Sequence, residues 1–322
     1  MRESEILEFE VDKEFEGKRL DQFLASVYPE YSRSYYQKLI KEGNVLEKEK
    51  NLKKPSFKVK SGQKITLIIP PPKPLEVIPE NIPLKVFYED EDLAVIYKPP
   101  HMVVHPSPGH TSGTLVNALL YHFKNVSQFQ GKERAGIVHR LDKETAGLMV
   151  VAKSEFAHKE LQKLFQERKV NKKYKAIVVG LVKKEHGFID FPIGRSIYNR
   201  QKMGTVSTNA RDALTEYWVE KRWEKHNLTL VDIKLHTGRT HQIRVHFSEL
   251  GHPLLNDKVY GFKKSQLESE VAKELSDKLD YHALVAYRLA FNHPRTGEKI
   301  DISLENLPEP LEEIIKILNK EK

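Results

Sequence analysis

Residues 136–152 read GIVHRLDKETAGLMVVA and place a loop of ionisable side chains between two apolar runs. The first run, residues 136–139, and the second, residues 148–152, have the composition of buried strands. The loop that joins them crowds four charged side chains into eight residues. A loop between two core strands holds its side chains rigidly and still leaves them within reach of a ligand. This stretch therefore predicts a reactive site carried by a sheet.

Strand-like and helical patterns alternate irregularly along the rest of the chain. Residues 93–97 predict a further strand, and residues 156–168 predict an amphipathic helix. Because no regular strand–helix–strand rhythm appears, a doubly wound parallel sheet is disfavoured. The sequence predicts an α+β fold with a mixed, largely antiparallel sheet and flanking helices. Residues 311–322 predict a charged amphipathic helix that packs on this domain.

A proline-rich segment, Ile69-Pro70-Pro71-Pro72-Lys73-Pro74, interrupts the pattern. Proline fixes φ and lacks a backbone N–H donor, so this segment predicts a stiff, extended linker. We therefore expect a small α/β domain over residues 1–73, a linker over 74–80 and the larger α+β domain over 81–322.

The small domain shows two helical patterns, at residues 19–25 and 34–41. Residues 57–60 and 65–69 have the character of strands, and Ser61-Gly62 between them is typical of a turn. This part of the sequence predicts two short helices packed on a small sheet that contains a 57–69 hairpin.

Composition narrows the functional classes. The 322 residues include no cysteine, which removes disulfides, thiolate nucleophiles and the commonest structural zinc sites. No stretch approaches the roughly 20 apolar residues that a membrane helix needs, and residues 1–12 carry five carboxylates and no apolar leader segment. We therefore expect a cytoplasmic protein without a membrane partner.

The positive charge is concentrated in the small domain. Residues 33–64 hold ten Lys or Arg and three Glu, a net charge of +7 where the whole chain has +8. Clustered cations bind nucleic-acid phosphates through counterion release, although a solvated lysine-rich surface has the same composition. The side chains that we expect to bind RNA are Arg33, Lys38, Lys41, Lys53 and Lys54.

Motifs in the small domain favour RNA binding. Arg19-Leu20-Asp21, then Ser34, then residues 39–45 and the turn at Gly62, resemble the small RNA-binding domain first described in ribosomal protein S-four. The loops after residues 45 and 62 depart from the Val-Asn-Gly and Gly-Asp turns that are common in that family. The resemblance therefore rests on the helices.

The larger domain resembles an enzyme family. Residues 139–147, HRLDKETAG, are similar to the signature of the RluA and RluD types of ribosomal RNA pseudouridine synthase, in which the aspartate is catalytic. Four further blocks follow in the family's order: Lys98-Pro99-Pro100 with Val104-His105-Pro106, residues 113–120, residues 173–176 and residues 237–246. The resemblance covers nearly the whole chain and implies isomerisation of uridine to pseudouridine.

This reaction breaks the bond from C1′ to N1 of uracil and rejoins the base through C5. It adds no atom and has no net redox change, so the resemblance implies neither a cofactor nor a metal. The family's chemistry calls for a carboxylate beside the ribose, a cation that keeps it ionised and a flat ring for the base. Asp142, Arg244 and Tyr174 match these roles. Direct attack by Asp142 and removal of a C2′ proton by Asp142 both stay open.

Each of these residues also has an ordinary structural explanation. Asp142 would suit the cap of a short turn. Arg244 would suit the exposed side of a helix over residues 242–250, and Tyr174 would suit any strand. The family resemblance favours the active-site roles.

A uridine inside folded RNA hides its C1′, so the enzyme must extrude the nucleotide into a pocket. The resemblance implies that Arg140 helps replace the flipped base, and Ile243 is expected to pack against the uracil. We place His139, Thr145 and His105 in the same substrate site. Large-subunit ribosomal RNA is the favoured target, transfer RNA is the alternative, and we expect a monomer.

Two departures from the family pattern stand out: Ala146 replaces Ser or Thr, and residues 254–257, LLND, replace a Gly-Asp pair. We expect neither to touch the chemistry. The histidines at 236, 241, 246 and 252 suggest a metal site, but on a helix intervals of five and six residues point successive side chains in different directions. We therefore expect these histidines to be structural or to contact RNA. Two rival functions remain: a non-catalytic RNA-binding or ribosome-assembly protein, and an RNA hydrolase with Asp142 as general base.

Overall fold

The computed structural model describes residues 4–70, 77–107, 110–199 and 202–321. The chain divides into two compact units, Met1–Pro74 and Leu75–Lys322, which are described separately. Residues 74–76 of the expected linker lie outside the described residues.

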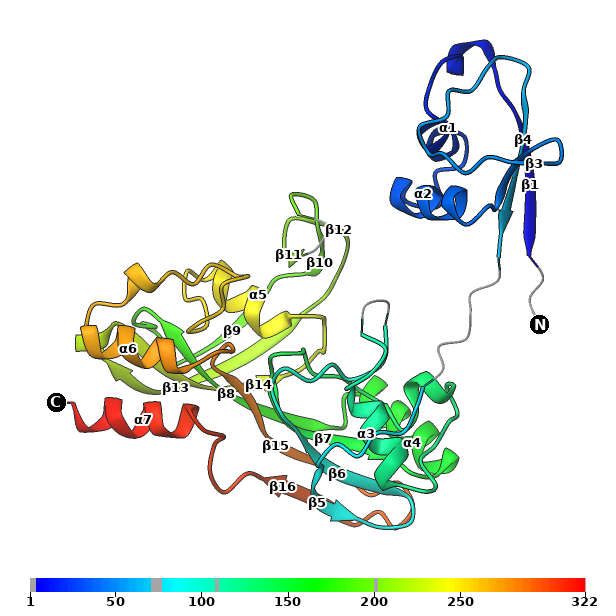
Figure 1. Cartoon of the computed structure of the whole chain (residues 1–322). Helices are drawn as coiled ribbons and strands as arrows, with labels where there is room; N and C mark the ends of the chain where they lie inside the picture. Colours follow the sequence, from blue (N-terminus) through cyan, green and yellow to red (C-terminus); the bar gives the residue numbers. More distant parts are fainter. Residues whose placement is uncertain (1–3, 71–76, 108–109, 200–201, 322) are drawn as a thin grey trace. The chain divides into compact units, whose positions relative to one another are not determined.

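The first unit packs two helices on a four-stranded antiparallel sheet of order β1-β4-β2-β3 (Figure 1). The apolar faces of helices and strands share one core, as the helical spacing of the sequence predicts. The elements are β1 (Glu5–Glu10), η1 (Lys13–Phe15), α1 (Leu20–Val27), α2 (Arg33–Lys41), β2 (Val45–Glu47), β3 (Lys50–Asn51) and β4 (Lys64–Ile69).

The expected 57–69 hairpin is wrong. Strand β4 pairs with β1 on one side and with β2 on the other, so both of its edges are occupied. Val59 is buried, and its backbone bonds to Gly17 and Lys18 instead. Residues 57–60 therefore run beside the start of α1, where Lys58 forms a single bridge to Arg19.

Asp21 ties the two helices of the first unit together. Its buried carboxylate accepts hydrogen bonds from Arg19 Nε at 3.0 Å, Arg33 Nε at 2.9 Å and Gln37 Nε2 at 2.6 Å. Burial opposes the charge, but these hydrogen bonds hold the pKa of Asp21 well below its usual range. The aspartate of the Arg19-Leu20-Asp21 motif is therefore a structural anchor.

The second unit is built on a nine-stranded mixed sheet, which confirms the α+β prediction. The strand order is β5-β6-β7-β15-β8-β14-β13-β9, with β16 added beside β15. The pairing of β7 with β15 is parallel and the remaining named pairs are antiparallel. The strands are β5 (Lys85–Glu89), β6 (Leu93–Lys98), β7 (Ala146–Ala152), β8 (Asn171–Val179), β9 (His186–Asp190), β13 (Leu214–Trp223), β14 (Leu228–Leu235), β15 (Leu284–Asn292) and β16 (Lys299–Ser303).

Helices cover both faces of this sheet. Along β7, Met149 and Val151 enter the core that contains α3 and α5, whereas Leu148 and Val150 face α4. This alternation is the two-residue period of a strand buried on both sides. Helices α6 and α7 pack over a third core near β13, whereas α3 and α4 lie near β7 (Figure 1). The helices are α3 (Leu115–His122), α4 (Glu155–Gln166), α5 (Gln242–Glu249), α6 (Glu270–Lys278) and α7 (Leu311–Lys320), with short turns η2 (Lys132–Arg134), η3 (Glu224–His226) and η4 (Lys264–Gln266).

A separate three-stranded sheet of order β11-β10-β12 extends from the second unit. It consists of β10 (Ile193–Ser196), β11 (Met203–Gly204) and β12 (Ser207–Arg211). Its Ile193 and Met203 pack with Val245 of α5 and with Tyr260, so this sheet is anchored beside the start of α5.

The motif segment enters the large sheet through β7. Residues 148–152 form the expected strand as part of β7. The strand expected at residues 136–139 is absent, and in this described segment Ile137 makes one isolated bridge to Val151. Gly147 has φ 135°, and a Cβ atom built there would lie 2.3 Å from the backbone oxygen of Ala286. The parallel approach of β7 to β15 therefore requires glycine directly after the loop.

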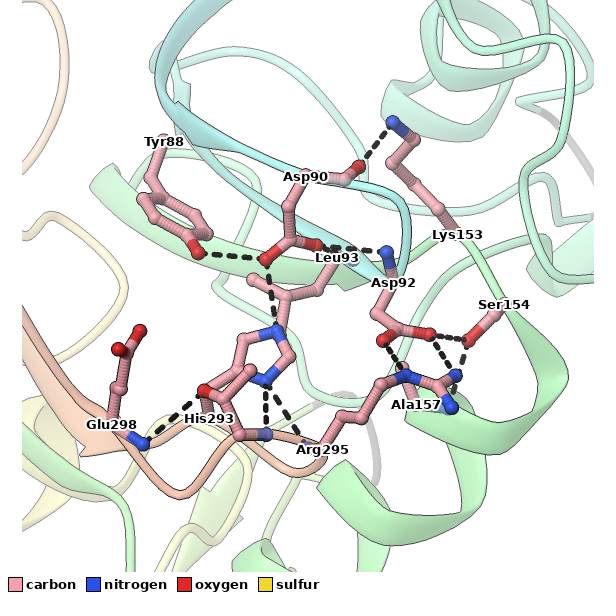
Figure 2. A network of polar contacts seen from close by, with 11 residues as sticks. Tyr88, Asp90, Asp92, Leu93, Lys153, Ser154, Ala157, His293, Arg295 and Glu298 are labelled. Carbon is pink, nitrogen blue, oxygen red and sulfur yellow. Dashed lines mark hydrogen bonds and ion pairs between the residues drawn. The ribbon is translucent and has the colours of Figure 1, made fainter.

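Two aspartates of the β5–β6 turn fasten distant parts of the second unit (Figure 2). Asp90 accepts from the Tyr88 hydroxyl at 2.7 Å and from His293 Nε2 at 2.8 Å. Asp92 accepts from Ser154 Oγ at 2.6 Å and from the Arg295 guanidinium. The network joins this turn to the start of α4 and to the β15–β16 turn.

Replacing Asp92 by Asn should lower the free energy of unfolding by about 1–3 kcal/mol at pH 7, because a buried charge-assisted contact is lost. Arg295 lowers the pKa of Asp92 to about 2, below its value in the unfolded chain. Its stabilisation is therefore present above pH ~4 and lost as the pH falls towards 2.

Urea unfolding at pH 7 and pH 3 measures this effect, and the gap between wild type and variant should narrow at pH 3. Glu91→Gln, which alters the exposed neighbouring carboxylate, is the control and should change stability by less than about 0.5 kcal/mol. An equal loss in both variants would contradict the assignment.

None of the helices in the described part of the chain has the length and apolar character that crossing a bilayer requires.

Candidate active site

The motif loop forms part of the wall of a cavity of about 670 Å³ in the second unit. The eight residues that we expected to act in catalysis and substrate binding all line it. They come from the segment after β6, the loop before β7, strand β8 and helix α5. These residues are His105, His139, Arg140, Asp142, Thr145, Tyr174, Ile243 and Arg244. Their roles stay predictions, but the structure brings them to one site.

Asp142 and Arg244 meet across this cavity although 102 residues separate them. Arg244 Nη1 donates to Asp142 Oδ2 at 3.3 Å, with side-chain exposures of 8% and 17%. Arg244 lies in the first turn of α5, whose Ile243 and Phe247 are buried. Its guanidinium is therefore a buried ionic partner of the carboxylate.

Asp257 contacts the candidate site residue Arg244, although we expected residues 254–257 to lie away from the proposed chemistry. Its carboxylate accepts from Arg244 Nε at 2.7 Å and from Nη2 at 3.0 Å, a two-point ion pair with fixed geometry. Burial opposes its charge, but Arg244 keeps the pKa of Asp257 below its usual range. Asn256 has φ 64°, a left-handed conformation that Gly and Asn tolerate. Asn256 therefore occupies a turn position that also suits glycine, and Asp257 forms the ion pair with Arg244.

Tyr174 presents its ring from β8. Its side chain is buried, at 6% exposure, and it lines the same cavity as Asp142. Burial raises the pKa of the Tyr174 phenol, and the charge of Asp142 adds to this. The ring is therefore a neutral, flat surface that suits stacking on a base.

Lys98 fixes the motif loop from the end of β6. Its buried ammonium donates to three carbonyl oxygens, those of Pro99 at 2.7 Å, Met102 at 3.0 Å and Lys143 at 3.0 Å. Burial lowers the pKa of Lys98 to about 7. The Lys98-Pro99-Pro100 block was part of the resemblance, but its contact with the loop is not visible in the sequence.

The other predicted substrate-binding residues differ in their contacts with the rest of the protein. His139 Nε2 accepts the Val150 N–H at 3.0 Å, and its ring stacks on Phe165 with centroids 4.5 Å apart. Burial lowers the pKa of His139 to about 3, so the ring is neutral. The Thr145 hydroxyl lies 2.7 Å from His282 Nε2. Arg140 is exposed and lines the cavity.

The four histidines at 236, 241, 246 and 252 each contact a different group, and only His246 lies within α5. The partners are Glu216 for His236, Tyr260 for His241, Thr215 and the Phe191 carbonyl for His246, and the Val179 carbonyl for His252. Of these histidines, His241 also faces Asp142, with 3.8 Å between Nε2 and Oδ1. His241 was not among the predicted active-site residues. Its position three residues before Arg244 is the feature of the sequence that could have indicated a place in the site.

The five cations predicted to bind RNA are exposed on the first unit. Arg33, Lys38 and Lys41 lie on α2, whereas Lys53 and Lys54 follow β3. The Arg33 guanidinium forms an ion pair with Asp21, and Lys38 Nζ lies 3.9 Å from the Glu42 carboxylate. Their contacts with RNA stay predictions.

Comparisons with known proteins agree with this geometry. The family described as RNA pseudouridylate synthase matches residues 92–249, and the S4 domain matches residues 18–65. An uncharacterized RNA pseudouridine synthase of Aquifex aeolicus is 53% identical over 320 residues, 99% of either chain. Ribosomal large subunit pseudouridine synthase D of Zymomonas mobilis is 42% identical over 309 residues, 95% of either chain.

A solved structure has a similar fold. Human RNA Pseudouridylate Synthase Domain Containing 1 aligns with a TM-score of 0.53 and 25% identity, covering 74% of this chain and 96% of that one. The motif loop, the shared cavity and relatives that align over nearly the full length lead to one conclusion: the chain belongs to the RNA pseudouridine synthase family and carries an S4 domain.

Proposed function

We propose that this RNA pseudouridine synthase modifies large-subunit ribosomal RNA and that Asp142 is its catalytic carboxylate. The observation that carries the proposal is that Asp142, its ion-pair partner Arg244 and the ring of Tyr174 line one cavity. A carboxylate that is paired with a guanidinium inside a cavity is suited to react at the ribose or the base of a bound uridine.

The remaining wall of the cavity suits an extruded nucleotide. Ile243 and Tyr174 offer apolar surface for the uracil, and the exposed Arg140 would occupy the space that the base leaves in the RNA. His139, Thr145 and His105 would complete the contacts to the nucleotide. In the reaction the C1′–N1 bond breaks, a C1′–C5 bond forms, N1 gains a proton and C5 loses one.

Two routes for Asp142 make different predictions. Direct attack joins the carboxylate oxygen to the nucleotide, whereas proton removal at C2′ gives a glycal before the base rejoins. Deuterium at C2′ should give a primary isotope effect only on the second route, because only there does the covalent bond between C2′ and its hydrogen break.

Ribosomal RNA is favoured because several relatives that cover most of the chain are named ribosomal large subunit pseudouridine synthase D. Transfer RNA is the alternative target. We also propose the cytoplasm as the compartment, the first unit as the RNA-binding domain, and a monomer as the working form.

Tritium release from RNA that contains [5-³H]uridine tests the proposal, because the exchange of N1 for C5 frees the hydrogen at C5. Purified enzyme with EDTA should release tritium from large-subunit ribosomal RNA. Release from transfer RNA alone would favour the alternative target. Release from neither RNA would defeat the assignment, and cleaved strands with metal dependence would favour the hydrolase.

The cations of the first unit make a separate prediction. Changing Lys38, Lys41, Lys53 and Lys54 together to Ala should weaken RNA binding and reduce the slope of log K against log salt by about 3, since each phosphate contact contributes about 0.7–0.9. Filter binding between 50 and 300 mM salt would measure this. The matched control replaces four exposed lysines of the second unit by Ala: Lys225, Lys278, Lys316 and Lys320. Equal slopes for both variants would contradict the role of the first unit.

A further inference from the structure

Asp142 has a neighbour on each carboxylate oxygen. Arg244 Nη1 lies 3.3 Å from Oδ2, and His241 Nε2 lies 3.8 Å from Oδ1. His241 is the residue directly before α5, and Arg244 lies in the first turn of this helix, so both side chains reach the carboxylate from the same end of α5. The arginine has its own support in Asp257, which raises the question of what supports the histidine.

His241 adopts a backbone conformation that its residue type rarely takes. Its φ is 57°, in the left-handed region, directly before α5 begins. Such a conformation costs about 1–3 kcal/mol and persists where surrounding contacts over-determine it, often at a functional site. In this conformation the imidazole lies between Asp142 and the Tyr260 hydroxyl.

Tyr260 holds the far side of the imidazole. Its hydroxyl lies 2.7 Å from His241 Nδ1, and the two rings meet edge to face with centroids 5.6 Å apart. The same hydroxyl accepts the backbone N–H of Met203 in β11 at 3.1 Å. The Arg244 guanidinium carbon lies 4.7 Å from the centre of the Tyr260 ring. Tyr260 therefore contacts both side chains that flank Asp142.

These contacts favour one position for the imidazole proton. Since the Met203 N–H is a donor, the tyrosine oxygen accepts it and can direct its own proton to His241 Nδ1. An accepting Nδ1 on a neutral ring leaves the proton on Nε2, the nitrogen that faces Asp142. Burial lowers the pKa of His241, with a smaller opposing effect of Asp142, and this favours the neutral ring.

We propose that His241 and Tyr260 are positioning residues that aim the carboxylate of Asp142. The chain of contacts runs from the Met203 N–H through the Tyr260 hydroxyl and the imidazole to Oδ1, while Arg244 holds Oδ2. Held at both oxygens, the carboxylate keeps one orientation relative to the ribose. This inference rests on the proposed catalytic role of Asp142 and concerns the rate of the chemical step, not the affinity for RNA.

Three variants separate the contributions. Tyr260→Phe removes the hydroxyl and keeps the ring. His241→Asn keeps a polar group near the Nδ1 position, and asparagine tolerates positive φ, but it cannot reach Asp142. His241→Gln places an N–H donor near the Nε2 position and so serves as the rescuing replacement.

Single-turnover rate constants are measured with [5-³H]uridine-labelled large-subunit ribosomal RNA at saturating enzyme, alongside RNA affinity and thermal midpoints. We expect Tyr260→Phe to be about 3- to 10-fold slower and His241→Asn about 10- to 100-fold slower. His241→Gln should be faster than His241→Asn by about tenfold. RNA affinity should stay within about twofold for all three.

Tyr88→Phe is the matched control, because it also removes a tyrosine hydroxyl bonded at 2.7 Å, but in the Asp90 network. Its single-turnover rate should equal that of the wild type. Wild-type rates in Tyr260→Phe and His241→Asn, or equal losses in both His241 variants, would overturn the inference. Failure of the proposed function is distinguishable, because it would leave the wild type inactive or Asp142→Asn active.

Discussion

Asp142→Asn should abolish tritium release, with a rate at least about 10³-fold below that of the wild type. Asparagine keeps the shape of the side chain but removes the negative charge that Arg244 faces at 3.3 Å. It can neither act as a nucleophile nor accept a proton as a base. Single-turnover assays with excess enzyme measure the chemical step directly, and RNA affinity should change by less than about twofold.

Glu144→Gln is the matched control for this variant. Glu144 lies two residues away in the same loop and pairs with His101 at 2.5 Å, and it is not among the residues that line the cavity. Its rate should stay within about threefold of the wild type. Normal tritium release by Asp142→Asn would remove the carboxylate from the mechanism and with it the proposed function.

A second large effect is expected at Asp257, whose side chain is only 1% exposed behind Arg244. In Asp257→Ala the buried guanidinium loses its two-point partner. Breaking a buried pair in this way costs about 3–5 kcal/mol of unfolding free energy. Activity should also fall about 10- to 100-fold, since Arg244 would no longer be fixed against Asp142.

Urea unfolding and single-turnover rates, both measured where the variant is fully folded, separate the two effects. Asp277→Ala is the control, because Asp277 forms an exposed ion pair with Lys264 and has a side-chain exposure of 63%. It should change stability by no more than about 1 kcal/mol and leave the rate unaffected. An Asp257 variant with wild-type stability and rate would show that Arg244 needs no second partner.

Local pattern was enough to predict several elements of the fold. Strands β6 and β7 and helices α4, α5 and α7 lie where apolar spacing indicated, since one face of each packs on a core. The 57–69 hairpin failed because strand pairing is non-local. Strand β4 pairs with β1 and β2, and the local pattern of residues 57–69 does not reveal these more distant partners.

The site shows the same division. The sequence motifs indicated Asp142, Tyr174 and Arg244 through family resemblance, and the structure places all three at one cavity. The contacts of Asp257 and Tyr260 with Arg244, and of Lys98 with the motif loop, were not predicted, because they join segments that are far apart in the chain. A local interpretation of residues 254–257 sees only a turn, because the partner of Asp257 is defined in three dimensions.

The groups that contact Asp142 and Arg244, as far as the chain is described, all belong to the second unit, whereas the five RNA-binding candidates belong to the first. Substitutions of the surface lysines on α2 therefore leave every described contact of Asp142 intact, whereas substitutions of Asp257 or Tyr260 alter contacts of Arg244. Divergence among related enzymes should therefore concentrate in the first unit.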